Sequence, residues 1–153
     1  MLTADTNIFV YAIDGRDQRK HEIAKDVRDR LKAISAPIGF QVVSEFYSAA
    51  TRRLKRTPWE AAQGARNLLM SYPCFAMTSD SISRALAEAS AGRFSYWDAL
   101  LLASADLAGC KAILSEDMAD GIRLGGIEVV HPFAEAGLSE RAQAALAEFG
   151  SGR

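Results

Sequence analysis

The sequence has little cysteine, little histidine and no excess of either charge. Its two cysteines, Cys74 and Cys110, are too few for a disulfide scaffold, and both lie in apolar runs, so we expect buried, reduced thiols. His21 and His131 have no Cys or His partner at zinc-ligand spacing. The formal net charge of -1 gives no global sign of nucleic-acid binding, although it leaves room for a local basic strip.

Long apolar segments and known hydrolase signatures are also missing. The longest apolar run, 99–105, is too short to cross a bilayer. No basic region precedes an apolar stretch at the start, so we expect a soluble cytoplasmic protein without a signal peptide. The chain contains no G-x-x-x-x-G-K-[ST], G-x-G-x-x-G, H-E-x-x-H or G-x-S-x-G motif. These absences exclude the commonest nucleotide-binding, zinc-peptidase and serine-hydrolase patterns.

What is present is a globular α/β pattern. The 153 residues with a hydrophobic fraction of 49% predict one domain over 1–150. Short apolar strands alternate with helices, which predicts an α/β fold with a mainly parallel sheet. The expected strands end before Asp5 and span 36–39, 74–78, 112–115 and 127–130. The expected helices span 16–32, 41–56, 57–70, 79–92, 99–108 and 139–149, and residues 151–153 are expected to fray.

Four acidic residues are expected at the edge of the sheet where such folds form their functional sites. Sites in open α/β sheets lie beyond the carboxyl ends of the strands. Asp5 ends the first expected strand, and Asp117 lies two residues beyond Ser115, after the fourth. Asp98 begins the apolar helix that leads into that strand, and Glu45 lies in the first turns of the helix after the second strand. We therefore expect these four carboxylates to meet at one edge.

Four neighbouring carboxylates would repel one another and raise their pKa values unless a cation lay between them. Mg²⁺ takes oxygen ligands and keeps several waters, and acidic Mg²⁺ sites recur in phosphoryl transfer. Taken singly, each acid also has an ordinary structural explanation as a turn cap, first-turn residue, loop acid or solvated helix position. Their apolar surroundings favour a site, because a carboxylate in an apolar segment is costly unless it is paired or metal-bound.

The motifs around these acids occur in an order that resembles PIN-domain ribonucleases, and most closely VapC-type toxins of bacterial type II toxin–antitoxin systems. The resemblance covers about residues 1–133. It rests on Asp5-Thr6-Asn7, Gln41-Val42-Val43-Ser44-Glu45-Phe46, Tyr96-Trp97-Asp98-Ala99-Leu100-Leu101 and Leu114-Ser115-Glu116-Asp117-Met118. It implies a Mg²⁺- or Mn²⁺-dependent endoribonuclease with a three-layer α/β/α fold. It also implies a homodimer that a cognate antitoxin holds inactive.

The resemblance also implies a role for individual residues. Asp5, Asp98 and Asp117 map onto the metal-binding acids, and Glu45 is the fourth catalytic acid, acting directly or through water. The positions that support the acids by hydrogen bonding are matched by Asn7 and Ser115. Glu116 and Asp120 are extra carboxylates to which the resemblance assigns no role. The expected reaction is in-line attack of an activated water on phosphorus, which leaves a 5′-phosphate and a 3′-hydroxyl.

A cluster of cations ends the helix that carries Glu45. A phosphate-binding strip for RNA and a simple complement to the helix dipole explain it about equally well. The cluster consists of Arg52, Arg53, Lys55 and Arg56. Three further cations, which would extend the strip or meet an acidic antitoxin segment, are Arg16, Arg19 and Lys20. The helix that begins near Trp59 is a candidate dimer interface.

Two other functions fit the same residues. One is a phosphatase-like hydrolase with Asp5 as covalent nucleophile, although Asn7 stands where such enzymes usually carry a second Asp. The other is a catalytically inactive RNA- or protein-binding module of the same fold. The identity of an RNA target, whether transfer, ribosomal or messenger RNA, is not encoded in any motif of this chain.

Overall fold

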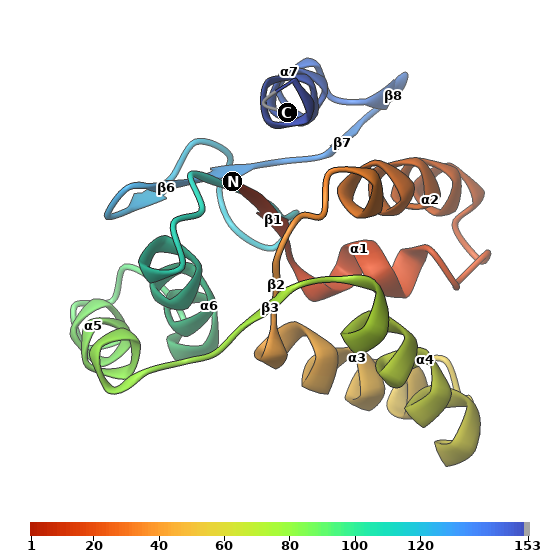
Figure 1. Ribbon diagram of the computed structural model, residues 1–153, viewed down its shortest axis with the longest axis horizontal. Coiled ribbons are helices and arrows are strands. Elements are labelled where there is room, and N and C mark those ends of the chain that lie inside the picture. The colour runs from red at the N-terminus through yellow and green to blue at the C-terminus, as the bar shows by residue number, and fades with distance from the viewer. Residues whose placement is uncertain (152–153) are drawn as a thin grey trace.

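The computed structural model describes residues 1–151 as a helix-rich α/β fold (Figure 1). The strands are β1 (Leu2–Ala4), β2 (Ile38–Gly39), β3 (Cys74–Phe75), β4 (Ala112–Leu114), β5 (Arg123–Leu124), β6 (Ile127–Val130), β7 (Phe133–Ala134) and β8 (Gly137–Leu138). The helices are α1 (Thr6–Tyr11), α2 (Gln18–Ala33), α3 (Phe40–Arg52), α4 (Pro58–Ser71), α5 (Ser79–Ser90), α6 (Tyr96–Leu107) and α7 (Glu140–Gly150). Of the frayed end predicted for 151–153, residues 152–153 lie outside the described part.

The central sheet has the strand order β1-β4-β6-β5. The first three strands are parallel, with Leu2 opposite Ala112 and Ala112 opposite Glu128. Strand β5 runs antiparallel to β6, so the sheet is mixed but mostly parallel, as the sequence predicts. The pairs β2-β3 and β7-β8 form two small separate sheets. The sequence pattern misses β5, β7 and β8, because two residues are too few to show an alternating period.

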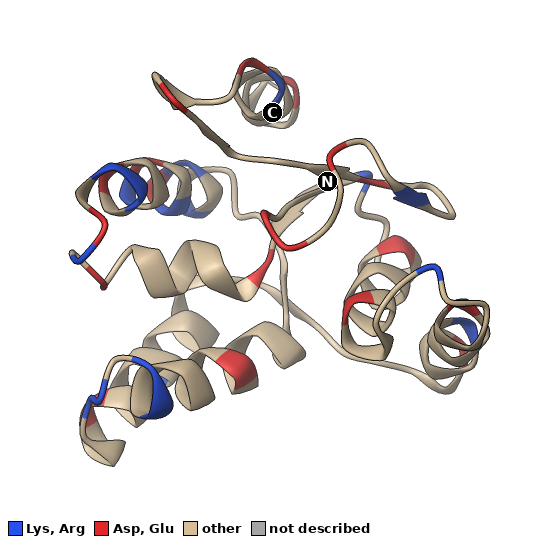
Figure 2. Cartoon of the chain, turned by 180° about the vertical axis from the view of Figure 1, so that it is seen from behind, with Lys and Arg blue, Asp and Glu red and all other residues tan. Residues whose placement is uncertain are grey.

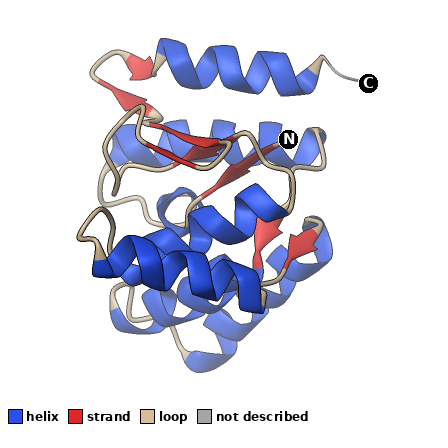
Figure 3. Ribbon diagram, turned by 90° about the vertical axis from the view of Figure 1, so that its left-hand side faces the viewer, coloured by secondary structure: helices blue, strands red, loops and turns tan. Residues whose placement is uncertain are grey.

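Helices cover the sheet on both sides. Figures 1 and 3 show α7 above the strands and α5 and α6 on the opposite side. Helix α7 contacts β1, whereas α6 contacts β5 and β6. The pairs α1–α2 and α3–α4 extend the molecule beyond the end of the sheet, and α1 packs against both α2 and α3. This arrangement confirms the layered α/β fold that the resemblance implied.

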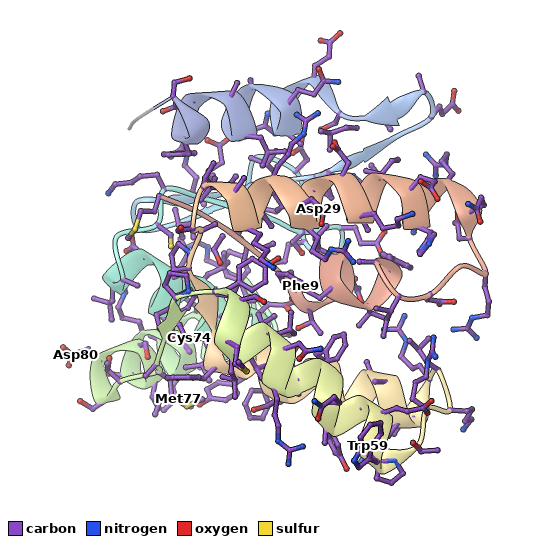
Figure 4. All side chains as sticks on the ribbon, turned by 45° about the vertical axis from the view of Figure 1, so that its right-hand side comes forward. Phe9, Asp29, Trp59, Cys74, Met77 and Asp80 are labelled. Atoms are coloured by element: carbon purple, nitrogen blue, oxygen red, sulfur yellow. The ribbon has the colours of Figure 1, made fainter. Side chains whose placement is uncertain are left out.

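Helix α6 forms the centre of the core. Every residue from 99 to 105 is buried, which confirms that a helix apolar on nearly all sides is central. Truncation of a fully buried leucine such as Leu102 in this helix would cost about 2–5 kcal/mol, since it leaves a cavity. Phe9 of α1 points into the interior, whereas Trp59 projects from α4 with 72% of its surface exposed (Figure 4).

Several boundaries differ from the prediction: α6 begins at Tyr96 rather than at 99 and β2 at Ile38 rather than at 36, while α3 and β3 end early. Helix α3 ends at Arg52 rather than at 56, because the amides of Arg53 and Leu54 both donate to the Ala49 carbonyl and Lys55 then adopts a φ of 54°. The predicted strand 74–78 stops at 75, because Thr78 caps α5 by accepting from the Ser81 amide. Within the described residues, no helix is both long and apolar enough to cross a membrane.

Candidate active site

Asp5 lies at the junction of the central sheet and α1. Its amide donates to the Leu114 carbonyl at 2.9 Å, so the pairing of β1 with β4 continues up to the acid. The carboxylate caps α1: Oδ1 accepts from the Thr6 amide at 2.6 Å, and Oδ2 accepts from Ser115 Oγ at 2.8 Å. Only 6% of Asp5 is exposed. A buried acid with both oxygens held in this way has a fixed orientation.

The pKa of Asp5 shows the electrostatic state of this site. The pKa is raised from 3.8 to about 6, mainly by burial, against the opposing effect of the hydrogen bonds from Ser115 and Thr6. The negative charges of Asp117 and Glu45 contribute to this rise. Three acids that are remote along the chain therefore lie near enough to repel one another.

Asp117 lies in the loop after β4 and is connected to Asp5 by one hydroxyl group. Ser115 Oγ donates to Asp5 and accepts from the Asp117 amide at 3.2 Å. Asn7 Nδ2 donates to Asp117 Oδ2 at 2.8 Å. The pKa of Asp117 is raised, first by partial desolvation and then by the negative charges nearby, among them Asp98. The negative charge of Asp117 therefore raises the pKa of Asp5, and the negative charge of Asp98 raises the pKa of Asp117.

Glu45 is held by residues from two directions. Thr6 Oγ1 donates to its Oε2 at 2.8 Å, and Gln41 Nε2 donates to its Oε1 at 2.7 Å. The same Gln41 nitrogen lies 3.0 Å from the carbonyl oxygen of Trp97, to which it also donates. Gln41 thus connects the helix of Glu45 to the first turn of α6, where Asp98 lies.

Asp98 is the acid with the fewest constraints. Its amide donates to Ser95 Oγ at 3.2 Å, the N-cap bond of α6. Its half-buried carboxylate accepts no hydrogen bond from the described residues. Figure 2 shows acidic segments at the start of α1, in the loop after β4, on α3 and on α6, all bordering one central region. Asp98 is free to turn toward that region.

The donor set suits a hard divalent cation. Carboxylate oxygens are the ligands that Mg²⁺ prefers, and the pKa of Asp117 is raised although the nearby Arg53 lowers it, so the negative charge is only partly compensated. In residues 1–151, no three Asp, Glu, His or Cys side chains already stand as a coordination sphere. Binding would therefore require rearrangement of side chains, for which the unbonded carboxylate of Asp98 is available. The carboxylate ligands therefore suit Mg²⁺ chemically, but their positions do not form a coordination sphere within residues 1–151.

The two extra acids have hydrogen-bond and ion-pair partners outside the set of four site acids, although the charge of Glu116 also raises the pKa of Asp117. Glu116 accepts from Tyr11 Oη and from Lys20 Nζ, the latter at 2.7 Å. Asp120 accepts from the His131 amide at 2.9 Å and pairs with Arg141. Because each is bound by cationic or hydrogen-bond donors outside the site, both have structural partners that the sequence did not indicate.

The predicted cations fall into different environments. Arg53 reaches the site, where its Nη1 donates to Asn7 Oδ1 at 3.1 Å, and it lowers the pKa of Asp117. Arg56 donates to the Ile13 carbonyl at 3.2 Å. Three other predicted cations have protein partners: Arg16 pairs with Asp14, Arg19 donates to the Ala134 carbonyl, and Lys20 pairs with Glu116.

Sequence reasoning missed Thr6 and Gln41 as members of the site. Thr6 lies between two residues that the sequence singles out, Asp5 and Asn7. Gln41 lies one helical turn before Glu45, and residues four apart on a helix face each other. That spacing was the available signal for Gln41, whereas the contact between Thr6 and Glu45 depends on how α1 packs against α3.

The chain is similar to a known protein family in sequence and to solved structures in fold. The family model described as PIN domain matches residues 3–119. None of the curated proteins is similar enough in sequence to match. The solved structure of VapC20 from Mycobacterium tuberculosis, described as a sarcin-ricin-loop-cleaving toxin, is similar with a TM-score of 0.58 and 21% identity, covering 74% of this chain and 87% of that one.

Two further solved structures are complexes. A toxin–antitoxin complex from Klebsiella pneumoniae is similar with a TM-score of 0.61 and 22% identity, covering 87% of this chain and 98% of that one. VapBC2 from Rickettsia felis, solved with a DNA fragment of its promoter, has a TM-score of 0.55 and 12% identity, covering 84% and 96%. At these identities the likeness concerns the fold.

Proposed function

Because the chain belongs to the PIN-domain family, we propose that it is a metal-dependent endoribonuclease that hydrolyses RNA phosphodiester bonds. PIN domains are typically nucleases and generally depend on metal ions. The observation that carries the proposal is electrostatic: the charges of Glu45 and Asp117 raise the pKa of Asp5, and Asp98 raises that of Asp117. A divalent cation relieves this repulsion, and the bound cation can in turn attract the phosphate of a substrate.

Each acid has a distinct role in this proposal. Asp5, Asp98 and Asp117 would hold Mg²⁺, or Mn²⁺ as a substitute, and the ion would supply positive charge for the phosphate and for activation of a water. Glu45, whose two oxygens already accept hydrogen bonds, helps to position the ion or the attacking water. Ser115 and Asn7 orient Asp5 and Asp117.

The chemistry is addition of water across a P–O3′ bond. The water oxygen forms a bond to phosphorus, the bond from phosphorus to the 3′-oxygen breaks, and one proton of the water ends on that oxygen. The products are a 5′-phosphate and a 3′-hydroxyl. At neutral pH Asp5, with a pKa of about 6, is ionised and can serve as a ligand.

We also propose that the protein is the toxin of a toxin–antitoxin pair, in which a cognate antitoxin blocks the site. The support is that similar structures include toxin–antitoxin complexes and a toxin. Homodimerisation belongs to the same proposal, with the exposed Trp59 on α4 as a candidate contact.

The phosphatase alternative is less compatible with the geometry. A nucleophilic Asp5 would need an accessible oxygen, but the residue is 6% exposed and both oxygens accept hydrogen bonds. A phosphoryl group on Asp5 Oδ2 would also displace the Ser115 hydroxyl that connects Asp5 to the amide of Asp117. A metal ligand needs only a free lone pair on one of the Asp5 oxygens, and each carboxylate oxygen has two.

The test is cleavage of ribosomal, transfer and messenger RNA by wild type, Asp98→Asn and Glu45→Gln with Mg²⁺, Mn²⁺ or chelator. The exposed Asp80 of α5, which lies at the edge of the molecule in Figure 4, supplies the control Asp80→Asn. We expect cleavage by wild type and the control only, and none with chelator. Equal cleavage by Asp98→Asn would contradict the mechanism, and absence of cleavage by wild type would favour the inactive binding module.

A further inference from the structure

The cations of this chain differ in what neutralises them. On α2, four basic side chains form ion pairs with carboxylates: Lys20, Lys25, Arg28 and Arg30. The end of α3 and the loop that follows are different, because the basic residues there form no ion pair with a described carboxylate. These residues are Arg52, Arg53, Lys55 and Arg56, and all four are exposed. Unpaired cations gathered in one segment favour an anionic ligand over a self-neutralised surface.

A pocket of about 370 Å³ lies beside this segment. Its lining comes from two loops that are remote along the chain, 13–16 between α1 and α2 and 53–56 between α3 and α4. The four cations in the lining are Arg16, Arg53, Lys55 and Arg56. The single acid in the lining, Asp14, already accepts from Arg16 at 2.9 Å. The pocket is therefore strongly positive, and Arg52 lies outside it.

The loop that supplies most of the cations has a defined conformation. The Arg56 amide donates to the Ala50 carbonyl at 3.0 Å, and the Arg56 guanidinium donates to the Ile13 carbonyl at 3.2 Å. Lys55 holds a φ of 54°, a conformation that is uncommon for residues other than glycine. These contacts join the two loops and fix the backbone that carries the cations before a ligand binds, which reduces the entropic cost of binding.

Arg53 connects the pocket to the acidic site. Its guanidinium donates to Asn7 Oδ1 at 3.1 Å, and the Asn7 amide donates to Asp117 Oδ2 at 2.8 Å. The positive pocket thus begins two hydrogen bonds from one of the proposed metal ligands. If one phosphate of an RNA strand lies at the acids, the neighbouring phosphates on one side of it extend toward the pocket.

We propose that this pocket binds a second phosphate of the RNA strand, one that flanks the phosphate to be cleaved; the inference rests on the proposed ribonuclease function. Guanidinium groups bind phosphate through paired, charge-assisted hydrogen bonds. Contacts to phosphate position a strand without reading its bases, so the pocket sets the direction and register of the RNA rather than its sequence. The fold brings Arg16, which the sequence already suggests as an extension of the basic strip, into one lining with three of the four cations of the cluster.

The experiment measures binding of a fluorescein-labelled single-stranded RNA of mixed sequence over a series of KCl concentrations. All proteins carry Asp98→Asn to prevent cleavage. The variants are Lys55→Asn, because asparagine tolerates the positive φ at 55, and Arg56→Gln. The matched control is Arg66→Gln, which removes an exposed cation without a described ion-pair partner on α4. Thermal unfolding of each variant checks that it is folded.

For each phosphate that a variant no longer binds, we expect the slope of log K against log[salt] to become shallower by about 0.7, as for single strands. The change should appear in Lys55→Asn, which removes a cation that makes no described hydrogen bond, and be absent from Arg66→Gln. Equal slopes in all variants, or the same change in Arg66→Gln, would contradict the proposal that this pocket binds a phosphate. A polyglutamate peptide serves as a second probe. If the variants bind this peptide more weakly but bind RNA as before, the ligand of the pocket is an acidic protein segment, and the phosphate proposal is wrong.

Cleavage separates this inference from the proposed function. In the background with intact Asp98, Lys55→Asn should raise KM severalfold with little change in kcat, because a flanking phosphate binds equally in ground and transition states. If wild type cleaves no RNA but the salt slopes still change, the ribonuclease proposal fails and the phosphate pocket stands. If wild type cleaves RNA and KM is unchanged in Lys55→Asn, the pocket fails alone.

Discussion

Burial of the Asp5 carboxylate lowers the free energy of unfolding at neutral pH when no metal is bound. Its pKa is raised from 3.8 to about 6, which means that the folded chain holds the proton more tightly than the unfolded chain. Between these two pH values the unfolded state loses its proton first, so the free energy of unfolding falls as the pH rises, by about 3 kcal/mol in total. Above pH 6 this loss is complete.

The first prediction is that Asp5→Asn stabilises the metal-free protein. With chelator present, the variant should unfold at a higher temperature than wild type at pH 7.5, and the difference should disappear near pH 3.5. Added Mn²⁺ should stabilise wild type and not the variant, because only wild type keeps this ligand. Thermal unfolding by circular dichroism measures all three, and a variant less stable than wild type at pH 7.5 with chelator would contradict the assigned charge state.

Ser115 supports the second prediction at this scale. Its hydrogen bond lowers the pKa of Asp5, so Ser115→Ala should raise that pKa further. The pH at which metal binding reaches half its maximum should therefore move upward. Ser104→Ala is the matched control, because Ser104 is also buried and its hydroxyl has no hydrogen-bond partner among the described residues. Mn²⁺ titrations from pH 5 to 8 compare the two, and an unshifted Ser115→Ala profile would count against the role of this hydroxyl.

At the scale of elements, the loop after β4 is fixed by its neighbours. Glu116 accepts from Tyr11 of α1 and Lys20 of α2, while Lys20 also lies 5.4 Å from the ring centroid of Phe133 in β7. The neighbouring Asp117 is therefore carried by a loop that two elements, α1 and α2, hold through Glu116. This brace gives Glu116 a structural role, which the sequence left without an assignment.

The third prediction concerns this brace. Lys20→Met should lower the free energy of unfolding by about 2 kcal/mol, between the cost for an exposed ion pair and that for a buried one, since the side chains are 24% and 13% exposed. Lys25→Met is the control on the same helix, because its pair with Glu22 is 40% and 57% exposed and should contribute under about 1 kcal/mol. Urea unfolding measures both, and equal losses would argue against the brace.

The fourth prediction tests how α4 packs on α3. A Cβ added at Gly64 would lie 2.8 Å from Phe46 Cε1, and Phe46 is buried. Gly64→Ala should therefore destabilise by about 1–3 kcal/mol, although alanine favours helix by about 1 kcal/mol elsewhere. Gly64→Ala combined with Phe46→Leu should recover part of the loss if the two side chains compete for space. Additive losses in urea unfolding would contradict this contact.

Elements that are long and periodic could be predicted from the sequence, and contacts between elements could not. The buried helix α6 and the capping box of Thr57 and Glu60 follow local rules. The end of α3 does not, because its cations continue the helical pattern, whereas the helix closes at Arg52 and Lys55 adopts a positive φ. The hydrogen bond from Thr6 to Glu45 depends on the angle between α1 and α3, which spacing along the chain does not encode.

At the scale of the whole molecule, the fold brings opposite charges into adjacent regions. The strand order places Asp5 and the Asp117 loop side by side, and α3 and α6 add Glu45 and Asp98. The α3–α4 loop places Arg53 and its unpaired neighbours at the border of these acids. A polyanion that binds through a divalent cation at the acids and through arginine beside them uses both regions, so ribonuclease activity should be salt-sensitive as well as metal-dependent.

The central claim is that Asp5, Asp98 and Asp117, from three segments of the chain, together hold a divalent cation. Calorimetric titration of Mn²⁺ at pH 7.5 into wild type, Asp5→Asn, Asp98→Asn and Asp117→Asn tests it most directly, with Asp80→Asn as control. We expect wild type and the control to bind Mn²⁺ equally and each of the other three to bind at least about 10-fold more weakly. Unchanged affinity in these three variants, or no binding by wild type, would contradict the account.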